Sequence, residues 1–159
     1  MTHKSVLLDT SFFVRLLNET DPLSRNADGY YKYFLQKQIA MVISTISVAE
    51  YCVRGAVDEL PLKNLHILPF NLPHSIMAGA FAGTIFNKKG ALNVPDRKII
   101  PNDTKLFAQA DTEDSIGYFL SSDRECKKIY DLLKIEGVEP KFNFLDLHIS
   151  YETAFGMLF

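Results

Sequence analysis

Four carboxylates stand where the sequence pattern places strand ends or helix starts, and their type suits metal or acid–base chemistry. Two follow short apolar runs that predict buried strands, and two lie at or just inside the start of expected helices. The four residues are Asp9, Glu50, Asp103 and Asp123. In an open parallel sheet, the strand ends and the following helix starts share one edge. The pattern therefore predicts that all four acids converge on a single cleft.

Each acid taken alone has an ordinary structural role. Asp9, Asp103 and Asp123 could be helix caps or first-turn acids, which satisfy free amides and the helix dipole. Glu50 follows Ser47 by three residues, the spacing of a capping box at a helix that would begin at Ser47. Together, however, the four would repel one another and raise some of their pKa values unless a cation lay among them. The set therefore predicts a site for a hard divalent ion.

Mg²⁺ is the ion that best suits this donor set, with Mn²⁺ as the alternative. Mg²⁺ takes oxygen ligands and keeps several waters, so a few carboxylates with open positions suit it. Zn²⁺ is a poorer fit because no Cys or His lies at ligand spacing to the acids. We expect the four histidines to be surface or core residues; they are His3, His66, His74 and His148.

A metal ion with open positions among acids points to phosphodiester hydrolysis. Such an ion lowers the pKa of a bound water and neutralises the phosphate, so no nucleophilic side chain is required. The chain has no G-x-S-x-G elbow and no plausible Ser/His/Asp set. It also lacks both glycine-rich nucleotide-binding motifs, which removes the usual dinucleotide and nucleotide cradles.

Apolar runs alternate with helical periodicity along nearly the whole chain. Expected strands cover residues 6–8, 39–44, 67–70, 117–122 and 142–147. Expected helices cover residues 12–17, 24–38, 47–55, 73–89, 102–110 and 123–133, with a weaker one at 56–65. This alternation predicts a three-layer, doubly wound α/β fold with a mostly parallel sheet of about five strands. The length fits a single domain over residues 1–159.

Composition adds limits on partners and location. The chain is 47% hydrophobic and 23% charged, with a formal net charge of −2, so no global field attracts nucleic acid. Any polyanion must be met by a local basic patch or through a metal. Cys52 and Cys126 match no C-x-x-C spacing and are expected to be small core residues within helices. With no signal-peptide pattern and no long apolar run, we expect a cytoplasmic protein that does not contact the membrane.

Four segments around the acids resemble a PIN domain, and within that family a VapC-type toxin ribonuclease. They are VLLDTSFFVRLL around Asp9, ISTISVAEY around Glu50, IPNDTKLFAQA around Asp103 and FLSSDREC around Asp123. The resemblance implies a PIN-like sheet of about five parallel strands, with a divalent metal held by the four acids. It also implies a metal-dependent endoribonuclease that acts as the toxin of a type II toxin–antitoxin pair, with RNA as substrate and a cognate antitoxin protein as partner.

The resemblance also assigns supporting roles. Thr10, Ser11 and Ser121 match positions where the family has polar residues beside the acids. Ser11 stands where Asn is frequent, Phe107 where a small residue is usual, and Cys126 where an aromatic is common. None of these departures removes a carboxylate, but they weaken assignment to a particular subfamily.

Substrate and protein contacts are expected outside the acid cluster. Arg97 and Lys98 interest us most as substrate contacts because their loop leads to Asp103, and Lys105 lies beside that acid. Other candidate cations are Lys88, Lys89, Arg124, Lys127 and Lys128. Aromatic residues in segment 24–38 are candidate antitoxin contacts, with core positions as the alternative; they are Tyr30, Tyr31, Tyr33 and Phe34. Gly79 and Gly83 suggest tight core packing or, less often, the seam of a homodimer.

Two further classes of protein compete with the nuclease interpretation. A catalytically inactive PIN-like module could bind RNA or protein, although such a module would have no chemical reason to keep a self-repelling cluster. A phosphatase or receiver domain also carries an acid at a strand end. The phosphatase type normally has a second Asp where this chain has Ser11, and the receiver type needs paired acids before it, so both are disfavoured.

Overall fold

Five parallel strands form one sheet in the computed structural model, which describes residues 4–89 and 101–157. The strands lie side by side in the order β3-β2-β1-β4-β5. Their bounds are β1 Ser5–Leu8, β2 Met41–Ser44, β3 Leu65–Leu68, β4 Ile116–Ser121 and β5 Asn143–Asp146. All four pairings are parallel, so the predicted sheet is confirmed. The chain order reverses across β1, which makes the carboxyl edge beside β1 a topological switch point.

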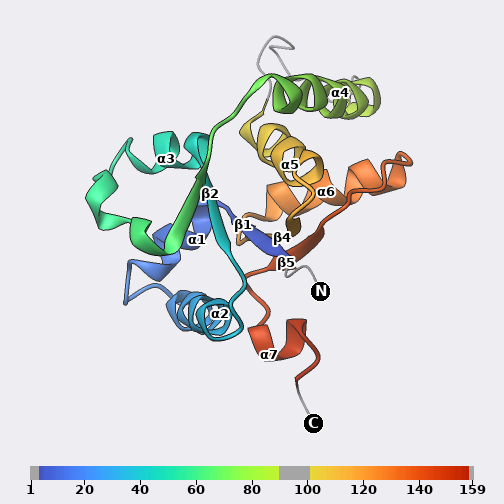
Figure 1. The fold of residues 1–159 in the computed structure, drawn as a ribbon. Helices are drawn as coiled ribbons and strands as arrows, with labels where there is room; N and C mark the ends of the chain where they lie inside the picture. Colours follow the sequence, from blue (N-terminus) through green and yellow to red (C-terminus); the bar gives the residue numbers. More distant parts are fainter. Residues whose placement is uncertain (1–3, 90–100, 158–159) are drawn as a thin grey trace.

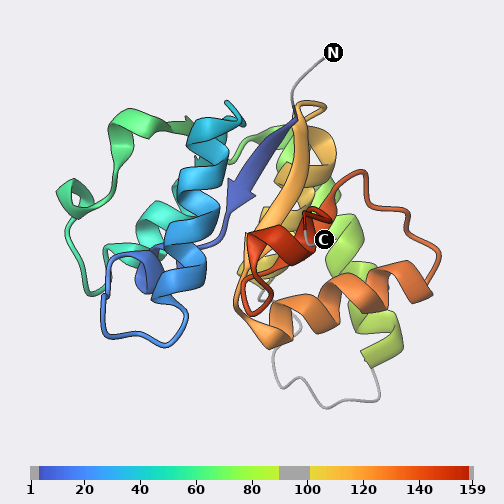
Figure 2. The ribbon, with the colours of Figure 1, turned by 90° about the horizontal axis from the view of Figure 1, so that it is seen from below.

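Helices cover both faces of the sheet, which confirms the predicted three layers (Figures 1 and 2). The helices are α1 Thr10–Leu16, α2 Ser24–Gln36, α3 Thr45–Tyr51, α4 Leu72–Lys89, α5 Asn102–Thr112, α6 Arg124–Ile135 and α7 Tyr151–Ala154. Helices α1 and α2 bury apolar side chains on one face, with α3 and α7 packed against them. Helices α4, α5 and α6 cover the other face.

The central strands supply side chains to both of these cores in turn. Along β1, Val6 and Leu8 face the α1–α2 core and Leu7 faces the α4–α6 core. Strand β4 does the same with Leu120 and Phe119. Successive strand side chains point to opposite faces, so a strand covered on both sides must be apolar throughout. This is why an unbroken apolar run precedes Asp9.

Segment 45–65 differs from the prediction. Helix α3 begins at Thr45 and not at Ser47, because Ser44 ends β2 in an extended conformation and its Oγ accepts the amide N–H of Ile46. Ser47 lies buried within α3, so the predicted capping box with Glu50 is wrong. The weak helix expected at 56–65 is also wrong. Two short 3-10 helices, η1 Val57–Glu59 and η2 Leu62–Asn64, occupy that region, and β3 begins at Leu65.

Several expectations for single residues are settled by burial. Cys126 is buried in α6 as predicted, but Cys52 is exposed at the end of α3, so its assignment to the core is wrong. The prediction of tight core packing at Gly79 and Gly83 is wrong too, because a Cβ built at either position meets no atom within 4 Å.

No helix in the described ranges is both long enough and apolar enough to cross a membrane.

The aromatic residues of α2 mostly lie in the core, and not on a surface that could contact an antitoxin. Tyr30 and Phe34 are fully buried, and the Tyr30 hydroxyl donates to the carbonyl of Ile149. Tyr33 stacks on Phe155 with ring centroids 4.7 Å apart. Tyr31 is half-buried, and its hydroxyl accepts a hydrogen bond from Asn64. The prediction that Tyr30 and Phe34 contact an antitoxin is therefore wrong, because both side chains are fully buried.

Replacing Phe107 by alanine should lower the free energy of unfolding by about 3–5 kcal/mol. The ring is fully buried and packs against Phe119 at 5.0 Å and Phe142 at 5.6 Å between centroids. Urea unfolding followed by circular dichroism measures the loss. Val53→Ala is the control, because the Val53 side chain is 78% exposed and should tolerate truncation. A loss below about 1 kcal/mol for Phe107→Ala would contradict the packing described here.

Candidate acid and metal site

Asp9 is the buried centre of the site. It follows β1 directly, and its backbone N–H donates to the carbonyl of Leu120 in β4. Only 7% of the residue is exposed. Burial raises its pKa above the ordinary value, with a further rise from the nearby charge of Glu50. Hydrogen bonds from Ser11 and Ser121 oppose that rise.

Two serines fix the orientation of the Asp9 carboxylate. The Oγ atoms of Ser11 and Ser121 each donate to Asp9 Oδ2, both at 2.7 Å. Each serine oxygen also accepts a backbone N–H, from Ser122 at 3.0 Å and from Asp123 at 3.0 Å. Because each hydroxyl has one hydrogen and that hydrogen is directed at Asp9, the side chains have little freedom to turn away. Both residues therefore stand beside the acid, as the sequence resemblance implied.

Glu50 reaches the site from a different place than predicted. It lies in the last turn of α3 and not in the first, because the helix begins at Thr45. The side chain is exposed, and its Oε1 accepts a hydrogen bond of 3.0 Å from Thr10 Oγ1. Thr10 is the first residue of α1, so this bond links the start of α1 to the end of α3.

Asp103 is a second acid of the site with a strongly raised pKa. It lies in the first turn of α5, and its pKa is raised to about 7, chiefly by burial. The charges of Asp9, Asp123 and Glu50 contribute to that rise, whereas a hydrogen bond from the Cys126 thiol opposes it. Burial and, after it, the charges of Asp103, Asp9 and Asp123 raise the pKa of the Cys126 thiol. The cysteine at a position where the family has an aromatic is therefore in direct contact with the acid cluster.

Asp123 is a helix cap and a member of the cluster at once. Its Oδ1 accepts the N–H groups of Glu125 at 2.9 Å and Cys126 at 3.4 Å, so the predicted capping role is correct. Asp103 is a first-turn acid of α5, the other predicted structural role, whereas Asp9 occupies the N-cap position of α1 without a side-chain capping bond. Stabilisation of a helix start therefore accounts for Asp123 and Asp103 and leaves Asp9 and Glu50 without that explanation.

The four acids lie near one another at the carboxyl edge of the sheet, where burial and their negative charges raise the pKa values of Asp9 and Asp103. Asp9 and Asp103 have raised pKa values, which means that negative charge is poorly compensated there. All the donors are oxygens, which suits Mg²⁺. As the side chains stand, no three Asp, Glu, His or Cys residues of the described ranges are grouped closely enough to hold one ion among them. Mg²⁺ is commonly bound through one or two carboxylates and several waters, so the donor set fits it.

The cations around the acids are mostly engaged. Lys127 pairs with Asp131 at 3.1 Å, and Lys128 pairs with Glu125 at 2.8 Å. Lys105 lies one turn along α5, with its Nζ 3.5 Å from Asn102 Oδ1. Arg97 and Lys98 fall outside the described residues, as do the side chains of Lys88 and Lys89.

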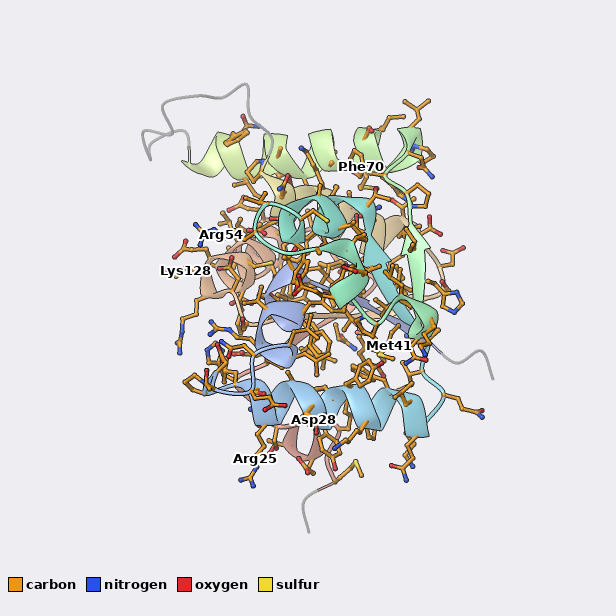
Figure 3. All side chains as sticks on the ribbon, turned by 90° about the vertical axis from the view of Figure 1, so that its left-hand side faces the viewer. Arg25, Asp28, Met41, Arg54, Phe70 and Lys128 are labelled. Atoms are coloured by element: carbon orange, nitrogen blue, oxygen red, sulfur yellow. The ribbon has the colours of Figure 1, made fainter. Side chains whose placement is uncertain are left out.

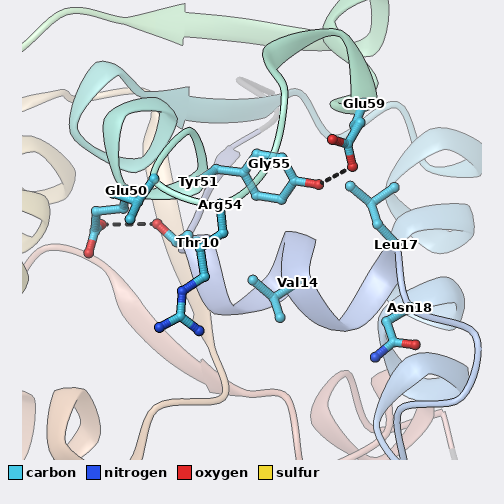
Figure 4. Close-up of a pocket in the computed structure, with 10 residues that line it drawn as sticks. Thr10, Val14, Leu17, Asn18, Glu50, Tyr51, Arg54, Gly55 and Glu59 are labelled. Carbon is cyan, nitrogen blue, oxygen red and sulfur yellow. Dashed lines mark hydrogen bonds between the residues drawn. The ribbon is translucent and has the colours of Figure 1, made fainter.

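Sequence reasoning missed one cation, Arg54. It lines a pocket together with Thr10 and Glu50 (Figure 4). Its position four residues after Glu50, one helical turn, is the signal that could have found it.

Asp103→Asn should stabilise the metal-free protein above about pH 7, by on the order of 2 kcal/mol. The folded pKa of about 7 exceeds the unfolded value of 3.8, so the folded chain holds this proton more tightly. The contribution of Asp103 to the free energy of unfolding is complete below about pH 4 and is lost as the pH rises through 7. Unfolding in chelator across pH 4–9 measures the difference between wild type and variant. Asp58→Asn, at an exposed acid, is the control; equal pH profiles for wild type and Asp103→Asn would contradict the assignment.

Solved structures share this fold. A chain of VapBC2 from Rickettsia felis, bound to a DNA fragment from its promoter, is 21% identical with a TM-score of 0.58; the match covers 89% of this chain and 97% of that one. A chain of DNA-bound VapBC from Salmonella typhimurium is 16% identical, also with a TM-score of 0.58, covering 91% and 98%. No family model and no curated protein matches the sequence. The chain thus has the PIN-like α/β fold found in these VapBC complexes.

Proposed function

We propose that this chain is a divalent-metal-dependent endoribonuclease and the toxin of a type II toxin–antitoxin pair. The observation that carries the proposal is the cluster of four acids at the switch point of the sheet, with Asp9 buried and held by two serines. A cluster of this kind is unfavourable for folding, and phosphodiester hydrolysis with a bound metal gives it a use. The likeness to VapBC chains supports the pairing with a second protein, the antitoxin.

Asp9 and Asp103 are the first candidates to hold Mg²⁺ or Mn²⁺, because burial and mutual repulsion raise their pKa values. Glu50 from the last turn of α3 and Asp123 from the N-cap position of α6 complete the oxygen donor set. When bound, the ion would lower the pKa of a water and neutralise charge on the phosphate.

The chain itself supplies orientation. Ser11 and Ser121 both donate to Oδ2 of Asp9 and so fix the orientation of its carboxylate. Thr10 holds Glu50 Oε1 in the same way. Asp9 and Glu50 thus each have one carboxylate oxygen already fixed, which reduces the reorganisation needed on binding.

Asp9→Asn should abolish RNA cleavage and leave the fold intact, because the amide keeps the shape of the side chain but not its charge. Purified protein is incubated with a mixed RNA pool and 5′-labelled products are resolved on a gel. Asp28→Asn is the matched control and should cut at the wild-type rate, because Asp28 is a half-exposed acid of α2 (Figure 3) that pairs with Lys32. Wild-type turnover by Asp9→Asn would overturn the assignment of this site.

Cleavage should require the metal. Chelator should reduce wild-type turnover to the level of Asp9→Asn, and added Mg²⁺ or Mn²⁺ should restore it. Zn²⁺ should restore it poorly, because the described donors are carboxylates. RNA binding without turnover in excess Mg²⁺ and Mn²⁺ would instead favour the inactive PIN-like binding module.

Ser121→Ala should reduce the cleavage rate by roughly 10- to 100-fold, because it removes a donor to Asp9 and the acceptor of the Asp123 N–H. The effect should be smaller than that of Asp9→Asn, since Ser11 remains. The measurement is the single-turnover rate at saturating Mg²⁺. Ser75→Ala, an exposed serine of α4, is the control; equal rates for Ser121→Ala and wild type would count against the orienting role.

A further inference from the structure

A pocket between α1 and the end of α3 opens beside the acid cluster. Its volume is about 580 Å³, within the range of ordinary ligand sites. The Thr10–Glu50 hydrogen bond lies at one end of it and the Tyr51–Glu59 hydrogen bond at the other (Figure 4). Because Glu50 belongs to both the pocket and the acid cluster, the two are continuous.

Arg54 gives the pocket its positive charge. It is the one cation among the residues that line it. The side chain is exposed, and within the described part of the chain it makes no ion pair, although Glu50 and Glu59 line the same pocket. Figure 4 shows its guanidinium toward the Thr10 end, away from Glu59. An unpaired guanidinium beside carboxylates that are themselves hydrogen-bonded is well suited to an incoming phosphate.

The rest of the pocket offers apolar surface. Val14 and Leu17 of α1 are 47% and 41% exposed along one wall. The Tyr51 ring forms part of the other wall, and its hydroxyl donates to Glu59 Oε2 at 3.0 Å. Gly55 permits that ring position, because a Cβ there would lie 2.5 Å from the Tyr51 ring. Unstacked RNA bases bind to aromatic and apolar side chains of this kind.

Glu59 does not oppose a phosphate at the Arg54 end. Its two carboxylate oxygens are taken up at the far end of the pocket, one by the Tyr51 hydroxyl and the other by the amide N–H of Ala56 at 2.7 Å. The pocket therefore has Arg54 and the hydrogen-bonded Glu50 at the end beside the acid cluster, and an apolar middle.

We propose that this pocket binds single-stranded RNA next to the phosphodiester that is cut, with Arg54 contacting a backbone phosphate and Tyr51 and the α1 wall receiving an unstacked base. This inference rests on the proposed ribonuclease function and names the surface that positions its substrate. Arg54 is a positioning residue. It supplies a local positive charge in a chain whose formal net charge is −2.

The test measures RNA affinity in the Asp9→Asn background, where cleavage does not consume the probe. A fluorescent single-stranded RNA of mixed sequence is titrated in Mg²⁺ at several KCl concentrations. Arg54→Ala should weaken binding by roughly fivefold to tenfold and reduce the slope of log K against log salt by about 0.7, the value for one phosphate contact. Arg54→Lys should keep the slope, because the charge remains.

Arg25→Ala is the matched control. Arg25 is an exposed arginine of α2, well away from Arg54 in Figure 3, and has no ion pair in the described ranges. Its loss should change neither affinity nor slope. Val14→Asp, on the apolar wall, should weaken binding as a second and independent variant.

The possible failures are distinguishable. An unchanged slope and affinity for Arg54→Ala overturns the inference, even where wild type cuts RNA with metal. A change in binding to a protein partner alone, with RNA affinity unchanged, overturns it in favour of a protein-docking pocket. If wild type does not cut RNA, the proposed function fails while the Arg54-dependent slope still supports an RNA-binding pocket. If no RNA binds at all, both fail.

Discussion

The burial of the Asp9 carboxylate is the constraint on which the site depends. Removing a carboxylate from water is costly unless hydrogen bonds replace those it loses, and here two serine hydroxyls do so. One comes from α1 and the other from the end of β4. The bond from Ser121 requires β1 and β4 to pair with Leu8 opposite Leu120. A slip of one residue would turn Ser121 to the opposite face, so the same register that packs the core also builds the site.

The four acids divide into two kinds, and the division explains how one fold tolerates them. Glu50 and Asp123 are exposed and keep water around their charge. Asp9 and Asp103 are withdrawn from water, and their pKa values rise as a result. The sheet therefore concentrates unfavourable charge at its switch point and offsets it with apolar cores on both faces. Proteins commonly accept such local conflicts where they carry out chemistry.

The sequence predicted the elements with the strongest physical signal. Strands buried on both faces need unbroken apolar runs, so the ends of β1 and β4, and with them Asp9 and Asp123, could be located. The start of α3 could not, because Ser44 and Ser47 are both good caps and the length of β2 decides between them. Cys52 and Arg54 lie beyond that helix, where exposure depends on the turn of the chain and not on residue type. The pairing of Ser11 and Ser121 through Asp9 depends on tertiary contacts alone.

The hydrogen bond from Ser121 to Asp9 joins residues 112 positions apart. During synthesis, the segment around Asp9 leaves the ribosome long before β4 does. Until β4 has emerged and paired with β1, Asp9 lacks one of its two hydroxyl donors, and Asp123, which directly follows β4, is not yet in place. A nascent or truncated chain therefore carries the first acid without the arrangement around it, so the complete site forms only when translation of the chain is nearly finished.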